Sequence, residues 1–97
     1  MEDIEIIKKN ALRRLIRANV WGGKHTPLDF VKKAVAAHLS HKELKLVEKA
    51  IKALVNDGWI LLAQKRTGKG SDVHVSLNPR KKPEMFHYLG LPPEKKD

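Results

Sequence analysis

Apolar residues recur at a helical spacing through the first part of the chain. They return every three or four positions along residues 4–19, 27–38 and 40–56, which predicts three amphipathic helices. The positions expected to face the core are Ile4, Ile7, Ala11, Leu12, Leu15, Ile16 and Ala18, then Leu28, Val31, Ala34, Val35, His38 and Leu39, then Leu44, Val47, Ala50, Ile51, Leu54 and Val55. A glycine pair at 22–23 predicts a break between the first two helices.

Capping residues predict where these helices begin and end. Thr26 suits an N-cap, because Pro27 then takes the first helical position, where its missing N–H costs nothing. Ser40 and Glu43 form a capping box at the start of the third helix. Gly58 suits a left-handed C-cap at its end. The second and third helices are therefore expected to be joined by only about three residues, as in a helix-turn-helix.

The spacing becomes an alternating one after Gly58. Residues 59–63 are rich in Trp, Ile and Leu, and residues 73–77 alternate Val or Leu with His and Ser, which predicts two strands. Residues 68–72 combine Gly, Ser and Asp, the residues that favour turns. The two strands are expected to form an antiparallel hairpin with a long, basic loop.

The end of the chain predicts one more helix. Pro79 is expected to end the second strand, and Pro83 suits the start of a short helix. The apolar segment Met85–Leu89 either seals the first helix or forms a homodimer contact. The predicted fold is α+β, with three helices followed by a two-stranded antiparallel hairpin and a short C-terminal helix. Residues 1–90 form a single domain and residues 91–97 a flexible tail.

The composition fits this plan. With 97 residues, 41% of them hydrophobic, the chain suits one domain with a modest core. It has no Cys, which excludes disulfides and Cys-ligated zinc. No apolar run approaches the roughly 20 residues that span a bilayer, and the acidic start does not resemble a signal peptide. We therefore expect a cytoplasmic protein that does not enter membranes.

The charge points to the kind of partner. A formal net charge of +9 indicates a polyanion, with nucleic acid first and an acidic membrane or protein surface second. A lysine-rich surface also serves solubility, and a thermophilic protein would look similar. The placement of the charges has to decide between these interpretations.

The third helix carries the most informative placement. A stripe about 100 degrees wide, on the side away from the predicted core, holds a set of basic side chains. This lysine stripe consists of His41, Lys42, Lys45, Lys49 and Lys52. Like charges at these spacings cost the helix a few tenths of a kcal/mol per pair, which makes sense if phosphates lie opposite. The alternative is a solvated face, moderated by Glu48.

The composition of the stripe favours contact with the phosphate backbone over the reading of bases. It has no Arg or Asn, the usual bidentate readers of guanine and adenine. Ser40, His41 and Lys42, near the start of the helix, are the residues placed to touch bases. We expect modest sequence specificity.

Two further basic groups follow the third helix. The hairpin loop holds Lys65, Arg66, Thr67 and Lys69. Arg66 suits a narrow minor groove, although an ordinary soluble loop has a similar composition. Arg80, Lys81 and Lys82 come after the second strand, where they either clamp a phosphate or keep the chain end soluble. Another basic cluster, Arg13, Arg14 and Arg17, is expected to face solvent.

Other classes of function lack support in the residues. The chain has no glycine-rich phosphate loop at the required spacing, no nucleophile elbow and no paired-carboxylate spacing, so no catalytic residue or cofactor is predicted. His38 and His41 lie across the predicted turn without a carboxylate at ligand spacing, so no metal site is predicted and His38 is interpreted as a packed histidine. Trp21 and Trp59 are the only tryptophans, and Trp59, at the start of a strand directly after a helix cap, is interpreted as a core residue. The lack of aromatic residues on a sheet face argues against single-strand binding by stacking.

The order of elements, with "LVNDGWI" leading into a basic hairpin that ends "VHVSLNP", resembles the winged-helix DNA-binding family. The "GGKHTP" and "VSLNPRK" segments are similar to small stand-alone winged-helix proteins of archaea. This resemblance covers about residues 4–80. It implies a third helix in the major groove, contacting DNA through Ser40, His41, Lys42, Lys45, Lys49 and Lys52. It also implies a wing that carries Lys65, Arg66, Thr67 and Lys69 to the minor groove or backbone.

The resemblance leaves several alternatives open. The chain lacks the turn glycine, and only "VWGGKHT" is available for the family's short first strand. Winged helices also bind RNA or dock on proteins, so the fold alone does not decide the function. The expected role is a duplex-DNA-binding transcriptional regulator or chromatin-type protein, nucleoid-associated in the cytoplasm. An RNA-binding protein or a protein-interaction module is the alternative.

Overall fold

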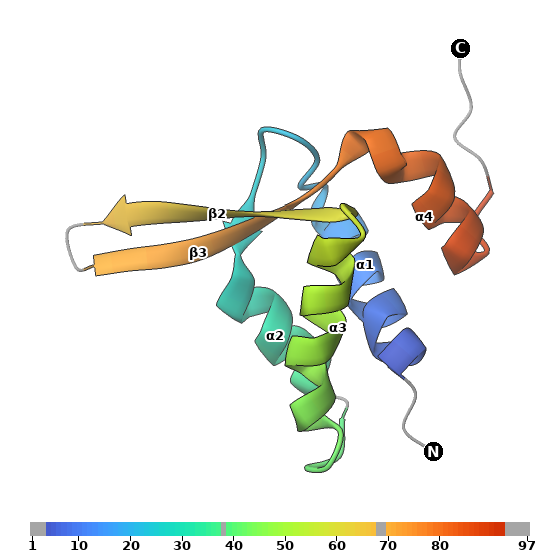
Figure 1. Ribbon diagram of the computed structural model, residues 1–97, viewed down its shortest axis with the longest axis horizontal. Coiled ribbons are helices and arrows are strands. Elements are labelled where there is room, and N and C mark those ends of the chain that lie inside the picture. Colours follow the sequence, from blue (N-terminus) through green and yellow to red (C-terminus); the bar gives the residue numbers. More distant parts are fainter. Residues whose placement is uncertain (1–3, 38, 68–69, 93–97) are drawn as a thin grey trace.

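The computed structural model describes residues 4–37, 39–67 and 70–92, and these form an α+β fold. The elements in chain order are α1 (Ile4–Ala18), β1 (Thr26–Pro27), α2 (Leu28–Ala36), α3 (Leu44–Asn56), β2 (Ile60–Thr67), β3 (Gly70–Leu77), the 3-10 helix η1 (Pro79–Lys81) and α4 (Lys82–Leu89). The strands make an antiparallel sheet of order β1-β3-β2. Figure 1 shows α1, α2 and α3 packed together. The strands β2 and β3 extend past α2 on one side of the molecule, and α4 lies on the opposite side.

The strand β1 corrects the expected start of the second helix and the expected two-stranded sheet. Thr26 pairs with Val75 and Pro27 with His74. Pro27 has the extended angles φ −59° and ψ 134°, and α2 begins only at Leu28 without a side-chain cap. The predicted N-cap role of Thr26 and first helical position of Pro27 are therefore wrong. A residue before proline is already driven toward extended angles, and pairing with β3 then satisfies its backbone groups.

The hairpin is built from longer strands than its apolar residues predict. The register continues without interruption from the Ile60–Leu77 pair to the Thr67–Gly70 pair. The backbone of Lys65 to Thr67, expected in a long loop, is therefore part of β2. Pairing along a strand needs only backbone donors and acceptors, so polar side chains do not end it.

The core lies where α1, α2 and α3 meet the sheet. Its largest fully buried side chains are Ile7, Leu12, Leu15, Leu54, Ile60, Val75, Leu77 and Met85. Two positions predicted to be buried are exposed, Ala18 and Leu44. They are the last residue of α1 and the first of α3, so each lies at the edge of the core. No helix of the described ranges is long and apolar enough to cross a membrane.

The capping box before α3 forms, but the helix begins later than predicted. The Ser40 N–H donates to the Glu43 carboxylate at 3.0 Å, and the Glu43 N–H donates to the Ser40 hydroxyl at 3.4 Å. These bonds close a separate turn, since the Leu46 N–H donates to the Glu43 carbonyl three residues back, at 2.9 Å. Continuous α-helix therefore starts at Leu44, and residues 37–43 make a longer connection than the expected helix-turn-helix break.

The end of α3 is as predicted. Gly58 adopts φ +74°, and its N–H donates to the Val55 carbonyl at 3.0 Å. The Trp59 N–H donates to the Leu54 carbonyl at 3.0 Å, which completes a Schellman motif. This cap leads directly into β2 at Ile60, so it fixes the direction of the hairpin relative to α3.

The C-terminal helix α4 closes the core over α1. Met85 is fully buried and Leu89 is 8% exposed. The rings of Trp59 and Tyr88 meet edge to face at 5.2 Å between centroids. Of the two roles predicted for this segment, sealing α1 is the one that Met85 and Leu89 perform, and a homodimer contact stays a prediction.

A hydrogen bond ties α4 to the first turn of α1. The Tyr88 hydroxyl donates to the Glu5 carboxylate, and Lys8 lies 3.4 Å from the same group. The hydrogen bond from Tyr88 lowers the pKa of Glu5 below its usual value, and the nearby Lys8 and Lys9 lower it further. Ionised Glu5 therefore favours the folded state above the usual carboxyl pKa, and this contribution is lost as the pH falls through the lowered value.

Replacing Tyr88 with Phe is expected to raise the pKa of Glu5 toward that of a free glutamate. The phenyl ring keeps the packing on Trp59 but cannot donate to the carboxylate. An NMR titration of the Glu5 side-chain carbon in both proteins measures the change. An unchanged Glu5 titration in Tyr88→Phe would mean that the hydroxyl is not the donor in solution.

Candidate nucleic-acid interface

The lysine stripe predicted from the sequence lies on the solvent side of α3 and the turn before it. Lys45, Lys49 and Lys52 are exposed on the helix, and His41 and Lys42 are exposed in the turn. The opposite side of α3 buries Val47, Ala50, Ile51 and Leu54. Burial of these four side chains fixes the rotation of the helix, so the stripe has one defined direction outward.

Within the described part of the chain, carboxylates do not neutralise the lysines of the stripe. Among the described residues, no carboxylate pairs with Lys42, Lys45, Lys49 or Lys52. Glu48, the acid expected to moderate the stripe, lies 3.2 Å from the ammonium group of Lys32 on α2. The positive charge along α3 is therefore left facing solvent.

The turn before α3 is less positive than the helix. The Glu43 carboxylate accepts from the Ser40 N–H, and this backbone hydrogen bond, followed by that with the Ser40 hydroxyl, lowers the pKa of Glu43. Glu43 therefore carries a negative charge in the same turn as His41 and Lys42. The Ser40 hydroxyl is already engaged in the capping box with Glu43, so it is less available to a ligand. Lys45, Lys49 and Lys52 therefore form the stronger part of the candidate surface.

The hairpin residues predicted to contact DNA belong to β2. The backbones of Lys65, Arg66 and Thr67 pair with Asp72, Ser71 and Gly70 on β3. Lys69 lies outside the described residues, as does His38. Figure 1 shows the hairpin as a two-stranded arm that extends well beyond the helices.

The basic cluster after β3 is partly engaged inside the molecule. The ammonium group of Lys82 lies 4.9 Å from the ring centre of Trp21 and 5.8 Å from that of Phe86. Lys81 lies 3.8 Å from the Glu84 carboxylate. Within the described ranges, Arg80 is the member of this cluster whose side chain has no ion pair or ring contact. Arg80 is therefore the member best placed to meet an external phosphate.

A histidine pair that the sequence analysis did not predict lies beside β1. The Nδ1 atoms of His25 and His74 are 2.9 Å apart, and the rings meet edge to face. One ring must donate and the other accept, so the pair connects the segment before β1 to β3. The alternation along residues 73–77 predicts that His74 lies on a strand. Its partner His25 lies in a segment with no helical or alternating spacing, so the sequence did not indicate the pair. No set of three or more metal-binding side chains occurs in the part of the chain that is described.

The chain matches no family model, and no curated protein or solved structure was found to match it.

Proposed function

We propose that the protein binds duplex DNA through α3, without catalysis. The observation that carries this proposal is the row of exposed lysines on α3 that have no carboxylate partner among the residues the structure describes. Such a row destabilises an isolated helix slightly, and phosphates opposite it remove that cost. The net charge of +9 adds long-range attraction for the same ligand.

The arrangement of elements supports a winged-helix mode of binding. The chain runs α1, β1, α2, α3 and then a hairpin, an order compatible with that fold. In this mode α3 lies in the major groove, with Lys45, Lys49 and Lys52 against phosphates. The hairpin brings Lys65 and Arg66 to the adjacent backbone or minor groove. Modest specificity follows from the lack of Arg and Asn in the lysine stripe.

RNA is the second candidate because the same lysines would also attract its phosphates. An A-form duplex has a deep, narrow major groove that does not admit an α-helix. Because the unpaired cations lie on a helix, B-form DNA is the better fit. Binding to RNA would have to use phosphates alone.

Fluorescence anisotropy of the purified protein tests this proposal. A labelled DNA duplex of random sequence and an RNA duplex of matched sequence and length are titrated across a salt series. We expect tighter binding of the DNA, with a salt dependence that reports several phosphate contacts. Preference for RNA would support the second candidate, and lack of binding to either at low salt would show that the lysine stripe is only a solvated face.

A further inference from the structure

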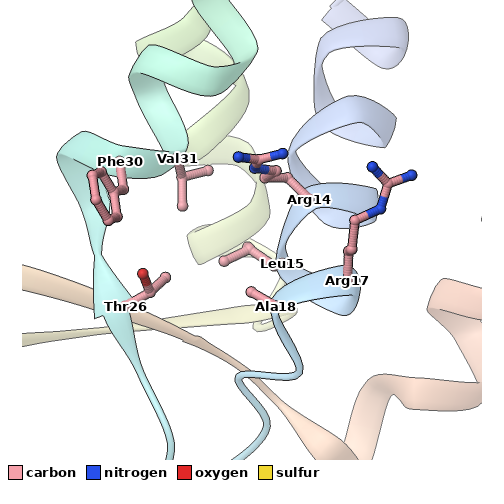
Figure 2. A pocket seen from close by; sticks show the side chains of 7 residues that line it. All are labelled: Arg14, Leu15, Arg17, Ala18, Thr26, Phe30 and Val31. Carbon is pink, nitrogen blue, oxygen red and sulfur yellow. The ribbon is translucent and has the colours of Figure 1, made fainter.

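A second basic surface lies on the other side of the helices from the exposed face of α3. A groove of about 450 Å³ runs between α1 and α2 and is lined by Arg14, Leu15, Arg17, Ala18, Thr26, Phe30 and Val31. Figure 2 shows α1 and α2 in front with α3 behind them, and Figure 1 shows α3 in front. We call this the α1–α2 groove. None of its lining residues belongs to α3.

Phe30 is the least expected residue of the groove. It is 70% exposed, although the chain holds only two phenylalanines and its core is short of aromatic residues. Its position lies off the buried stripe of α2, so its exposure is a consequence of the sequence. Figure 2 shows Phe30 on one wall and Arg14 on the other, with Leu15 and Val31 between them. Exposed aromatic anchors beside apolar surface are typical of protein-binding sites.

The arginines of the groove carry positive charge that the described part of the chain does not pair. Among the described residues, neither Arg14 nor Arg17 forms an ion pair. Both also line an adjoining hollow with Asn10, Arg13, Ala34 and Val35. The apolar and basic surface therefore continues along the seam between α1 and α2. Guanidinium groups match carboxylates in a bidentate geometry.

We propose that the α1–α2 groove binds an acidic amphipathic peptide segment of a partner protein. An apolar side chain of the peptide packs against the exposed ring of Phe30 and beside Ala18, and its carboxylates meet Arg14 and Arg17. The groove and the adjoining hollow share Arg14 and Arg17 and follow one seam between α1 and α2, which suits an amphipathic segment better than a small molecule that needs to be enclosed. A second copy of the chain, at +9, would bring the same excess of positive charge, so it matches the arginines less well than an acidic peptide does.

A phage library of random peptides, selected on the immobilised protein, tests the proposal. We expect enrichment of peptides that place acidic residues beside Leu, Phe or Trp. The best of these is synthesised with a fluorescent label, together with a version in which Gln and Asn replace Glu and Asp. The neutral version should bind at least about tenfold more weakly, since it keeps the apolar contact but loses the charges.

Matched variants place the peptide in the groove. Phe30→Ala and the double change Arg14→Ala with Arg17→Ala are each expected to weaken peptide binding by about tenfold or more, as for aromatic and Arg anchors elsewhere. The control is the double change Lys24→Ala with Lys49→Ala, which removes two exposed charges outside the groove. It should change the affinity for the peptide less than about twofold. Thermal melting shows that each variant is folded.

Three results would overturn the proposal. The library could yield no acidic peptides, or the control could weaken the peptide as much as the arginine variant. Phe30→Ala could also abolish binding of duplex DNA with no effect on the peptide, which would assign the groove to nucleic acid. The proposed DNA contact of α3 is measured with a different ligand, so either proposal can fail without the other.

Discussion

Changing Lys45, Lys49 and Lys52 together to alanine is expected to weaken binding of any DNA duplex by on the order of a hundredfold or more at 0.1 M salt. The logarithmic salt slope should fall by about 2.7, since each lost phosphate contact removes about 0.9. The loss should be similar for all sequences, because lysines on phosphates carry no base information. Anisotropy titrations against several duplexes, each over a salt series, give both quantities.

The same substitutions should not unfold the protein. All three side chains are exposed and have no partner among the described residues, and alanine is the best helix former. Removing like charges three and four positions apart also relieves repulsion along α3. We therefore expect a melting temperature equal to or slightly above that of the wild type. Loss of DNA binding in this variant would then be a loss of contacts.

A second triple variant controls for total charge. Arg13, Arg17 and Lys24 are exposed, and none lies on α3 or the hairpin. Changing these three to alanine lowers the net charge as much as changing the three lysines. It should leave the salt slope nearly unchanged. Equal losses in the two triple variants would show that only the overall charge matters and would remove α3 from the interface.

The buried faces of the helices could be predicted because they follow from a spacing that few other structures satisfy. Val47, Ala50, Ile51 and Leu54 return to one side of α3 at every turn. Once that side is buried, the exposed position of the lysines follows from geometry alone. The exposed face was therefore predictable, whereas its lack of ion pairs was not. The Lys32–Glu48 pair joins two helices whose relative rotation depends on packing.

The wrong predictions concern the start of α2, the number of strands and the length of the hairpin strands. In each case backbone pairing forms a strand where the side chains show no alternation. β1 has only two residues, Thr26 and Pro27, and two residues show no alternation. The sequence "TP" suits a helix start equally well, and the available edge of β3 decides between the two structures. The polar ends of β2 and β3 extend by the same mechanism. Strand pairing between distant segments is a tertiary effect that local propensity does not report.

The sequence did not predict the α1–α2 groove, but two of its features stand out in the sequence pattern. Arg13, Arg14 and Arg17 were recognised as a solvent-facing cluster, and they are exposed. Phe30 does not belong to the predicted buried stripe of the second helix. A large aromatic residue at an exposed helix position was the sequence signal for a binding surface. Its meaning depends on which helix lies beside it, and the packing of α1 on α2 is a property of the fold.

Replacing Met85 with alanine is expected to destabilise the protein by about 2–5 kcal/mol, the cost of removing a large buried side chain and leaving a cavity. Met85 is fully buried where α4 closes over α1. Domains of this size have a total stability of about 5–15 kcal/mol, so the melting temperature should fall by on the order of 10–40 °C. Ile6→Ala is the matched control, because Ile6 is 54% exposed and should lose about 0.5 kcal/mol or less.

The concentration dependence of that unfolding decides between the two roles predicted for Met85–Leu89. If the segment only seals α1, chemical denaturation midpoints of the wild type and of Met85→Ala are independent of protein concentration. If it also joins two copies, folding is linked to assembly, and the wild-type midpoint rises with concentration while that of the variant rises less. We expect the first result, because a side chain already buried in its own core has no surface left to bury in a partner. A rising wild-type midpoint would transfer the dimer contact to Phe86 and Tyr88, which remain partly exposed.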